Sequence, residues 1–388
     1  MSKTEDKLIS ISILTYRNYR YLYDALDSVF SQDYSNIELI VSDDGSDNFP
    51  EQEIRSYINE NIRENIKNVI VNHEKINQGT VKHLNKVIEL ANGYYFAALA
   101  GDDVFYDKKT LSTYVENFKK NPGYLIQMAQ TAMFDETLTK LDYYYCRPDI
   151  IELLKKQDFD KLLEKLCFYP YFPSTSTCFT KALFGKVGKF DEQYRLIEDL
   201  PFHIRLMEQR IPILYCDFVA IKHREGGISH GATGALSKTK KMYYQDSLNV
   251  IKNEKMECLK KYKMDTEVKE HLKNEMLWYE EMLKDSTVKE LEFLMKHFGY
   301  SIKKMIQKNW WKFQGCGRTL ILFGGLFYFF VPITEPYYSV MLKNIDLKAV
   351  YSFAFAIFVV GAILWIVGRI GRFLGLQGIP RMRGFVIS

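Results

Sequence analysis

The sequence has 388 residues, of which 47% are hydrophobic, 15% aromatic and 26% charged. This composition excludes a disordered chain, a collagen and a small disulfide-stapled scaffold, and the length allows two or three domains with sizeable cores. The formal net charge of +4 is too small to indicate a nucleic-acid-binding protein. Six scattered cysteines without a CxxC pair favour a reduced, cytosol-facing protein. No cationic start followed by a long apolar run opens the chain, so we expect no cleaved signal peptide.

Short β-rich runs alternate with helical patterns from residue 8 to about residue 235, which is typical of βαβ units. The predicted strands are 8–14, 37–42, 68–73 and 94–100, and the predicted helices are 21–30, 54–66 and 81–91. The spacing indicates a doubly wound α/β sheet, whose ligands lie beyond the carboxyl ends of its strands. We therefore expect a first domain over residues 1–235.

The next part of the chain is expected to be helical. Residues 236–288 lack glycine and proline and are rich in lysine and glutamate, which predicts a helical extension. Residues 289–318 combine apolar side chains at helical spacing with seven Lys or Arg against two Glu. This pattern is typical of an amphipathic juxtamembrane helix at a bilayer surface. An ordinary surface helix packed on the first domain is the alternative.

Two hydrophobic membrane segments are predicted within residues 319–368. Residues 349–368 are uncharged and long enough to span a bilayer, whereas residues 319–334 are short for a full span and could be re-entrant. Buried helices of a soluble domain are the alternative for both. Arginines follow the second segment, in the basic tail 369–388, and lysines precede the first. The positive-inside rule then predicts a transmembrane hairpin with both ends in the cytoplasm.

Two acidic clusters follow predicted strands. Asp43 and Asp44 precede a glycine, and carboxylates there can bind a base or a ribose, although a simple Asp/Gly turn fits equally. Asp102 and Asp103 end the strand 94–100, where two adjacent carboxylates repel each other unless a cation is present. Oxygen ligands of this kind suit Mg²⁺ or Mn²⁺, and a solvated acidic turn is the alternative.

A third acidic pair, Glu198 and Asp199, precedes Pro201 and an apolar helical pattern. Acidic residues at a helix start complement the helix dipole, so capping is one interpretation. A carboxylate near an acceptor hydroxyl can instead act as a general base.

Five sequence segments, in this order along the chain, together resemble those of a known protein family. They read ISILTYRNYRYLYDALDSVFSQDY, IELIVSDDGSDN, NQGTVKHLNKVIELANGYYFAALAGDD, VGKFDE and IED. In this order they resemble glycosyltransferase family 2, over roughly residues 8–232. The resemblance implies the GT-A fold, a Rossmann-like mixed sheet flanked by helices.

The resemblance also implies site residues for a nucleotide sugar. Thr15 and Tyr16 of the opening motif, with Asp43, Asp44, Asn77 and Gly79, match the positions that bind the nucleotide. Two departures stand out in this part. The opening motif usually reads TYN, whereas Arg17 intervenes here, and Leu84 stands where many relatives have an arginine.

The remaining matches concern the metal and the reaction. Asp102 and Asp103 match a DxD-type motif, with Asp103 as the metal ligand and Asp102 nearer the ribose or the donor sugar. Asp199 matches the catalytic base, and Glu198 is its neighbour on the acceptor side. His223 lies in a late loop and is a candidate extra ligand, since imidazole suits Mn²⁺.

These expectations describe an inverting glycosyltransferase that uses Mn²⁺ or Mg²⁺. The donor is expected to be a nucleotide sugar, with UDP implied by the resemblance. The acceptor is expected to be a polyprenyl-diphosphate-linked saccharide of bacterial surface polysaccharide synthesis, and the C-terminal segments predict contact with membrane lipids at the inner face of the cytoplasmic membrane. A polyprenyl-monophosphate glycosyltransferase is an alternative. A non-catalytic membrane assembly partner is another.

Overall fold

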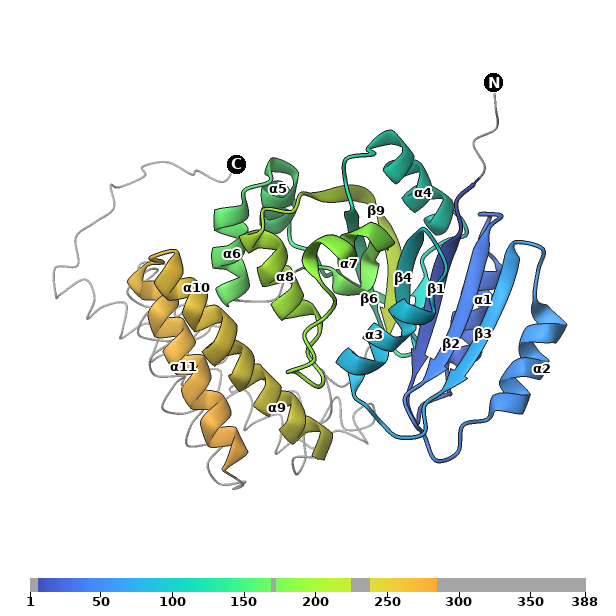
Figure 1. The fold of residues 1–388 in the computed structure, drawn as a ribbon, viewed down its shortest axis with the longest axis horizontal. Coiled ribbons are helices and arrows are strands. Elements are labelled where there is room, and N and C mark those ends of the chain that lie inside the picture. Colours follow the sequence, from blue (N-terminus) through green and yellow to red (C-terminus); the bar gives the residue numbers. More distant parts are fainter. Residues whose placement is uncertain (1–5, 169–171, 225–237, 285–388) are drawn as a thin grey trace, which may run out of the picture. The chain divides into compact units, whose positions relative to one another are not determined.

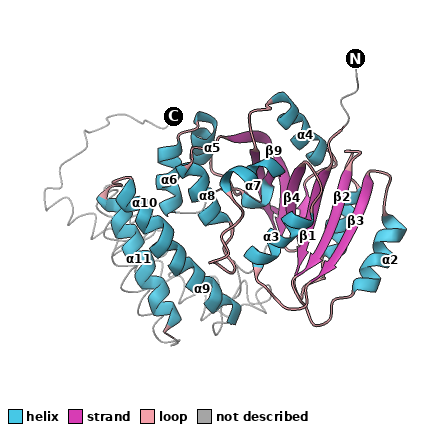
Figure 2. Ribbon diagram, viewed as in Figure 1, coloured by secondary structure: helices cyan, strands magenta, loops and turns pink. Residues whose placement is uncertain are grey.

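The strands of the described residues form one mixed sheet, drawn in magenta in Figure 2. The computed structural model describes residues 6–168, 172–224 and 238–284, and these belong to a single compact unit. In sheet order the strands are β3-β2-β1-β4-β8-β6-β9-β5, and β7 pairs with β6. Their bounds are β1 Ile9–Thr15, β2 Ile37–Asp43, β3 Ile66–His73, β4 Tyr95–Ala100, β5 Val104–Phe105, β6 Ile126–Phe134, β7 Leu141–Tyr144, β8 Thr177–Thr180 and β9 Ile213–Arg224.

The helices occupy the connections and the end of the described chain (Figure 1). They are α1 Leu22–Phe30, α2 Glu51–Asn61, α3 Thr80–Leu90, α4 Thr110–Lys120, α5 Pro148–Lys156, α6 Phe159–Phe168, α7 Lys181–Val187, α8 Asp199–Glu208, α9 Lys238–Val250, α10 Met256–Lys261 and α11 Thr266–Leu283. A short 3-10 turn covers Ser174–Ser176, and a π-helical turn at Ile251–Lys255 joins α9 to α10.

Helices cover both faces of the sheet. Alternate side chains of β2 point to opposite faces, so Leu39 and Val41 pack with α1, α2 and α4, while Ile40 packs with α3. Strands covered on both sides read as continuous apolar runs, and every residue of β2 is buried. The mixed α/β, GT-A-like architecture that the resemblance implied is therefore present.

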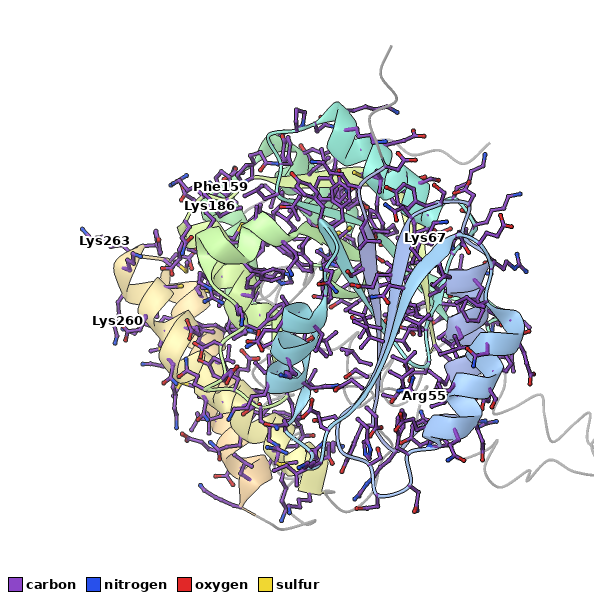
Figure 3. All side chains as sticks on the ribbon, turned by 45° about the vertical axis from the view of Figure 1, so that its right-hand side comes forward. Arg55, Lys67, Phe159, Lys186, Lys260 and Lys263 are labelled. Carbon is purple, nitrogen blue, oxygen red and sulfur yellow. The ribbon has the colours of Figure 1, made fainter. Side chains whose placement is uncertain are left out.

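The helical segment 238–284 packs against the same core as α3 and α5–α8. Val250, Ile251 and Leu259 belong to the apolar cluster that also contains Phe202 of α8. Figure 1 shows α9, α10 and α11 beside α6 and α8, in yellow to orange. The side chains of Lys67, Lys186, Lys260 and Lys263 face outward, as Figure 3 shows. The extension therefore packs on the same side of the sheet as α3 and α5–α8.

One predicted boundary is wrong. The helix expected over 54–66 is α2, Glu51–Asn61, and Ile66 instead begins β3. Apolar spacing alone placed this helix too late, because the first turn carries Glu51 and Glu53, and Ile54 and Ile58 are its only buried residues. Ile66 pairs in parallel with Ile37 of β2. This residue therefore belongs to the sheet, although its apolar spacing had assigned it to the helix.

The C-terminal predictions concern residues that the structure leaves undescribed. The amphipathic helix 289–318, the hydrophobic segments within 319–368 and the basic tail 369–388 all lie outside the described ranges. Among residues 6–168, 172–224 and 238–284, the structure contains no helix with both the length and the apolarity that a membrane crossing requires.

Candidate active site

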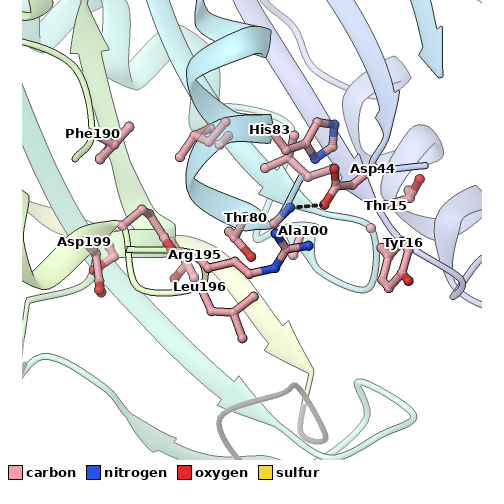
Figure 4. A pocket seen from close by; sticks show the side chains of 18 of the residues that line it. Thr15, Tyr16, Asp44, Thr80, His83, Ala100, Phe190, Arg195, Leu196 and Asp199 are labelled. Atoms are coloured by element: carbon pink, nitrogen blue, oxygen red, sulfur yellow. Dashed lines mark hydrogen bonds between the residues drawn. The ribbon is translucent and has the colours of Figure 1, made fainter. Parts of the chain in front are cut away.

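A cavity of about 1280 Å³ opens beyond the carboxyl ends of β1, β2 and β4. Its walls come from those strand ends, from the first half of α3, from the start of α8 and from α9. Figure 4 labels lining residues from the first three of these walls. The predicted site residues that line it are Thr15, Tyr16, Asp44, Asn77, Gly79, Asp102, Glu198 and Asp199. Asp43, Asp103 and His223 lie behind this lining. The structure therefore brings the predicted residues to one place.

Parallel pairing explains why the first segments meet. Thr15 of β1 is in register with Asp43 of β2, and Leu14 of β1 is in register with Ala100 of β4. Residues that follow these positions in the chain therefore emerge at one edge of the sheet.

Asp43 is fully buried and organises the turn that follows β2. Its Oδ1 accepts the backbone N–H of Ser46 at 2.7 Å, and its Oδ2 accepts the Ser46 hydroxyl at 2.8 Å. The Tyr19 hydroxyl donates to Oδ2 at 2.9 Å, and the Thr15 hydroxyl donates at 3.3 Å. Asp43 therefore supports the cavity from behind.

Asp44 faces the cavity and holds the loop before α3. Its Oδ2 accepts the Asn77 side-chain amide at 2.7 Å and the Gly79 N–H at 2.9 Å, and its Oδ1 accepts the Gln78 N–H at 2.8 Å. Burial raises the pKa of Asp44, and the backbone N–H groups of Gln78 and Gly79 oppose this shift. Asp44 thus fixes the loop 77–79, which forms one wall of the cavity.

Position 79 accommodates only glycine, because of its backbone conformation and the nearby Arg195 side chain. Its φ of +90° disfavours a side chain, and a Cβ there would approach Cγ of Arg195 to 2.4 Å. The Arg195 side chain crosses the cavity from the α8 side, as Figure 4 shows. Its Nη2 donates to the backbone oxygen of Asn77 at 2.9 Å and also to Oδ1 of Asn77.

Asp102 and Asp103 follow β4 but have different surroundings. Asp102 lines the cavity, and burial raises its pKa, with the negative charge of Asp103 adding to the shift. Asp103 is fully buried. Its Oδ2 bonds Nδ1 of His223 at 2.8 Å, and its Oδ1 accepts the backbone N–H of Arg224 at 3.0 Å. These bonds join the end of β4 to β9.

The chemical type of the Asp102 and Asp103 side chains suits a hard divalent cation. Two adjacent carboxylates supply the oxygen ligands that Mg²⁺ and Mn²⁺ prefer. The repulsion that raises the pKa of Asp102 is also what a cation would relieve. Across the described part of the chain, no group of three or more His, Cys, Asp or Glu side chains is arranged around one point. The metal roles of Asp103 and His223 stay predictions, and an ion there would replace their mutual bond.

Glu198 and Asp199 stand on the opposite wall, where α8 begins. The Ser174 hydroxyl donates to Oδ2 of Asp199 at 2.7 Å, and the Leu200 N–H donates to its Oδ1 at 2.7 Å. Burial raises the pKa of Glu198 to about 8, and the charge of Asp199 contributes to the shift. Burial and the neighbouring negative charge therefore favour the neutral form of Glu198. Asp199 can accept a proton from a bound hydroxyl.

His203 follows Asp199 by one helical turn and also lines the cavity. Burial lowers its pKa to about 4, against the opposing effect of Asp199. Its Nδ1 is buried without a hydrogen-bond partner among the described residues. The ring packs on Phe172 with centroids 4.8 Å apart. It is therefore a neutral imidazole in the wall beside Asp199.

Several lining residues were missed by the sequence motifs. Ser174, Arg195 and His203 contact or flank predicted site residues, and Lys238 and Lys240 bring the start of α9 to the cavity. Arg195 could have been noticed, because it is a cation four residues before Asp199. Ser174 and the residues of α9 have no such signal, since only the tertiary fold brings them to this wall.

Comparison with known proteins agrees with this geometry. Residues 10–173 match the sequence profile described as Glycosyl transferase family 2. This part of the chain is therefore similar to that family. The matched range contains the β1, β2 and β4 ends, the loop 77–79 and the Asp102–Asp103 pair. Glu198 and Asp199 lie beyond the matched range.

Relatives named as glycosyltransferases share this part of the chain. A Rickettsia typhi protein named as an uncharacterized glycosyltransferase is 29% identical over 222 residues, which are 57% of this chain and 65% of that protein. A Mycobacterium bovis BCG protein named as a PGL/p-HBAD biosynthesis glycosyltransferase is 26% identical over 231 residues, or 58% of this chain and 79% of that protein. The chain thus spans less than two thirds of the Rickettsia relative.

A solved structure is also similar. The mannosyltransferase PcManGT from Pyrobaculum calidifontis, in complex with GDP-Man and Mn²⁺, has a TM-score of 0.48 and 13% identity. The match covers 96% of this chain and 89% of that protein.

Proposed function

We propose that this protein is an inverting glycosyltransferase that transfers a sugar from a nucleotide sugar to an acceptor hydroxyl. One observation carries the proposal. A single cavity holds the Asp44-bound loop, the Asp102 carboxyl and the Asp199 carboxylate. A donor site and a general base on facing walls are what a direct displacement requires.

The donor half of the proposal rests on the strand ends. The loop 77–79, fixed by Asp44, and the side chains of Thr15 and Tyr16 form the wall proposed to bind the nucleotide. Asp103 would hold Mn²⁺ or Mg²⁺, which when bound neutralises charge on the diphosphate and improves the leaving group, and Asp102 would lie nearer the ribose or the donor sugar. UDP is the nucleotide that the motifs imply.

The acceptor half rests on the start of α8. Asp199 takes the proton of the acceptor hydroxyl as that oxygen forms a bond to the anomeric carbon. The bond from the anomeric carbon to the diphosphate oxygen breaks, and the nucleoside diphosphate leaves with the electron pair. Ser174 orients Asp199, and attack from the opposite face inverts the configuration.

We further propose that the acceptor is a polyprenyl-diphosphate-linked saccharide at the inner face of a bacterial cytoplasmic membrane. The support is the sequence of residues 289–388, with its cationic helical pattern and its two uncharged apolar stretches. An active site tethered at a bilayer suits an acceptor that is confined to the bilayer.

The variant Asp199→Asn tests the reaction. Purified full-length protein is assayed for release of nucleoside diphosphate from a panel of nucleotide sugars with Mn²⁺ and a lipid-linked acceptor. The asparagine can still accept the Ser174 hydrogen bond but cannot take the proton, so turnover should fall by about 10²- to 10⁴-fold. UDP affinity should stay within about twofold, because Asp199 acts on the acceptor side.

The matched control is Asp217→Asn, which removes an exposed carboxylate that pairs with Lys155 at the protein surface. Its turnover should equal that of the wild type. Near-normal turnover of Asp199→Asn would remove the base assignment. Absence of turnover by the wild type with every nucleotide sugar would contradict the proposed function itself.

A further inference from the structure

Arg195 is a cationic side chain of the cavity wall that forms no ion pair with a carboxylate among the described residues. Arg195 lines the cavity half-buried, and among the described residues none of its nitrogens lies within 4.0 Å of a carboxylate oxygen. Arg17, which also lines the cavity, pairs with exposed Asp47 at 2.7 Å. A guanidinium in this position lacks the anion that arginine side chains commonly bind.

The Arg195 side chain is held in place from two directions. Its Nη2 donates to the backbone oxygen and the side-chain oxygen of Asn77. Its backbone N–H, with that of Leu196, donates to Oδ2 of Asp246 on α9 at 2.7 and 2.6 Å. A side chain fixed at both ends loses little entropy when it binds a ligand.

The remaining donors of the guanidinium are unused. Nε is buried without a hydrogen-bond partner, and the hydrogen bonds that the described residues make with the guanidinium all go to Nη2. A buried N–H without a partner costs free energy. Figure 4 shows the guanidinium directed toward the side of the cavity where Asp44 and Tyr16 lie.

The neighbouring wall provides no fixed positive charge. The residues of α3 that line the cavity are Thr80, His83 and Leu84. Burial lowers the pKa of His83, and its Nε2 bonds the Ser42 hydroxyl at 2.7 Å, so this imidazole is neutral at pH 7. An anionic group against this wall therefore depends on another cation.

We infer that Arg195 is a donor-binding residue, whose free N–H groups contact the diphosphate of the nucleotide sugar. This inference rests on the proposed function and adds a residue that its motifs do not contain. A planar guanidinium binds phosphate oxygens through several parallel hydrogen bonds, which a neutral side chain cannot replace.

The test compares ligands that differ only in phosphate. Calorimetry of the full-length protein at constant Mn²⁺ measures the dissociation constants of UDP and of uridine. Arg195→Gln should weaken UDP binding by about ten- to hundredfold, the factor expected for lost charge-assisted hydrogen bonds. Uridine binding should change by less than about threefold, because uridine carries no phosphate.

Arg205→Gln is the matched control. Its guanidinium lies in the same region of the chain, also has a buried Nε without a partner, and bonds the backbone oxygen of Lys189 outside the cavity lining. This variant should keep the wild-type ratio of uridine to UDP dissociation constants. If Arg195→Gln does not fold, Arg195→Lys replaces it, since lysine keeps the charge but not the planar fork. Arg195→Lys should lower the ratio of uridine to UDP dissociation constants by several-fold.

The outcomes separate the inference from the function on which it rests. If the ratio of uridine to UDP dissociation constants is unchanged in both Arg195 variants, the inference is overturned. The proposed function stands in that case as long as the wild type binds UDP. A ratio that falls only in a Lys238→Gln/Lys240→Gln double variant assigns the diphosphate to the start of α9 and also overturns it. A wild type that binds neither UDP nor GDP overturns the proposed function, and the inference with it.

Discussion

Glu198 and Asp199 are neighbours in the chain, yet their carboxyl groups have different partners. The Ser174 hydroxyl and the Leu200 N–H donate to Asp199, whereas burial and the charge of Asp199 raise the pKa of Glu198 to about 8. Two carboxyl groups in such different surroundings can take different roles in acid–base chemistry. Asp199 lines the cavity and accepts both of these hydrogen bonds, so it is the carboxyl group placed to act as a base.

The raised pKa of Glu198 predicts a pH-dependent effect on stability. Between the unperturbed pKa of 4.5 and about 8, the folded protein binds more protons at this site than the unfolded chain does. Its contribution to the free energy of unfolding is therefore fully present below pH 4.5 and is lost as the pH rises through 8. The melting temperature of Glu198→Gln minus that of the wild type should therefore increase from pH 5 to pH 9.

The control for this prediction is Glu116→Gln, since Glu116 is an exposed glutamate on α4 that pairs only with Lys120. Its melting temperature should stay parallel to that of the wild type over the same pH range. Parallel curves for Glu198→Gln as well would show that the folded and unfolded states hold the Glu198 proton equally.

The sequence indicated the carboxylates of the site better than their partners. Asp44 and Asp102 were predictable because polar residues directly after apolar parallel strands must meet at one sheet edge. Ser174 and Asp246 were not predictable, because each reaches the site through contacts with residues far away in the chain. The different burial of Asp102 and Asp103 also escaped prediction, since it depends on the bonds that β9 makes to Asp103.

At the scale of elements, β1, β2, β4, α1 and α3 were predicted to within one residue, whereas β3 and α2 were not. The apolar runs of β1, β2 and β4 fix those strands to within one residue, because both faces of these strands are buried. The helix α2 was placed three residues late, because its first turn is acidic and exposed. The helical nature of 238–284 followed from composition, but its contact with the site did not.

The helix α9 contributes Asp246, which we regard as a positioning residue. Asp246 is 7% exposed, and its Oδ2 accepts two backbone N–H groups in the segment that leads to Glu198 and Asp199. Asp246→Ala leaves both buried N–H groups unpaired, which should lower the free energy of unfolding by about 1–3 kcal/mol. It should also raise KM for the nucleotide sugar several-fold, because Arg195 loses its support.

Asp246→Asn keeps an acceptor oxygen and should recover part of the wild-type KM. Ser247→Ala is the control on the same helix, since its hydroxyl donates to the Tyr243 backbone oxygen one turn earlier. Steady-state kinetics against the nucleotide sugar, with melting temperatures measured in parallel, distinguish positioning from general stability. A variant that loses stability but keeps its KM would contradict the role proposed for Asp246.

At the scale of the whole molecule, the described unit and the C-terminal sequence have different characters. Residues up to Thr287 cluster as one compact unit. Residues 319–334 and 349–368 contain no charged side chain. We predict that the full-length protein sediments with membranes and resists extraction by high salt and alkaline carbonate, because apolar spans are held by the hydrocarbon core.

A chain that ends at residue 287 should instead remain in the supernatant and keep its affinity for UDP. Immunoblots of the fractions and calorimetry of the shortened chain provide the measurements. Detection of the full-length protein in the supernatant after simple lysis and ultracentrifugation would contradict membrane attachment.

The long-range bonds around the cavity also bear on synthesis of the protein. Asn77 and Arg195 are 118 positions apart, Asp103 and His223 are 120 apart, and Arg195 is tied to Asp246 a further 51 positions along. Contacts of such high sequence separation form late in folding. A nascent chain on the ribosome therefore acquires a complete donor pocket only once α9 has left the exit tunnel.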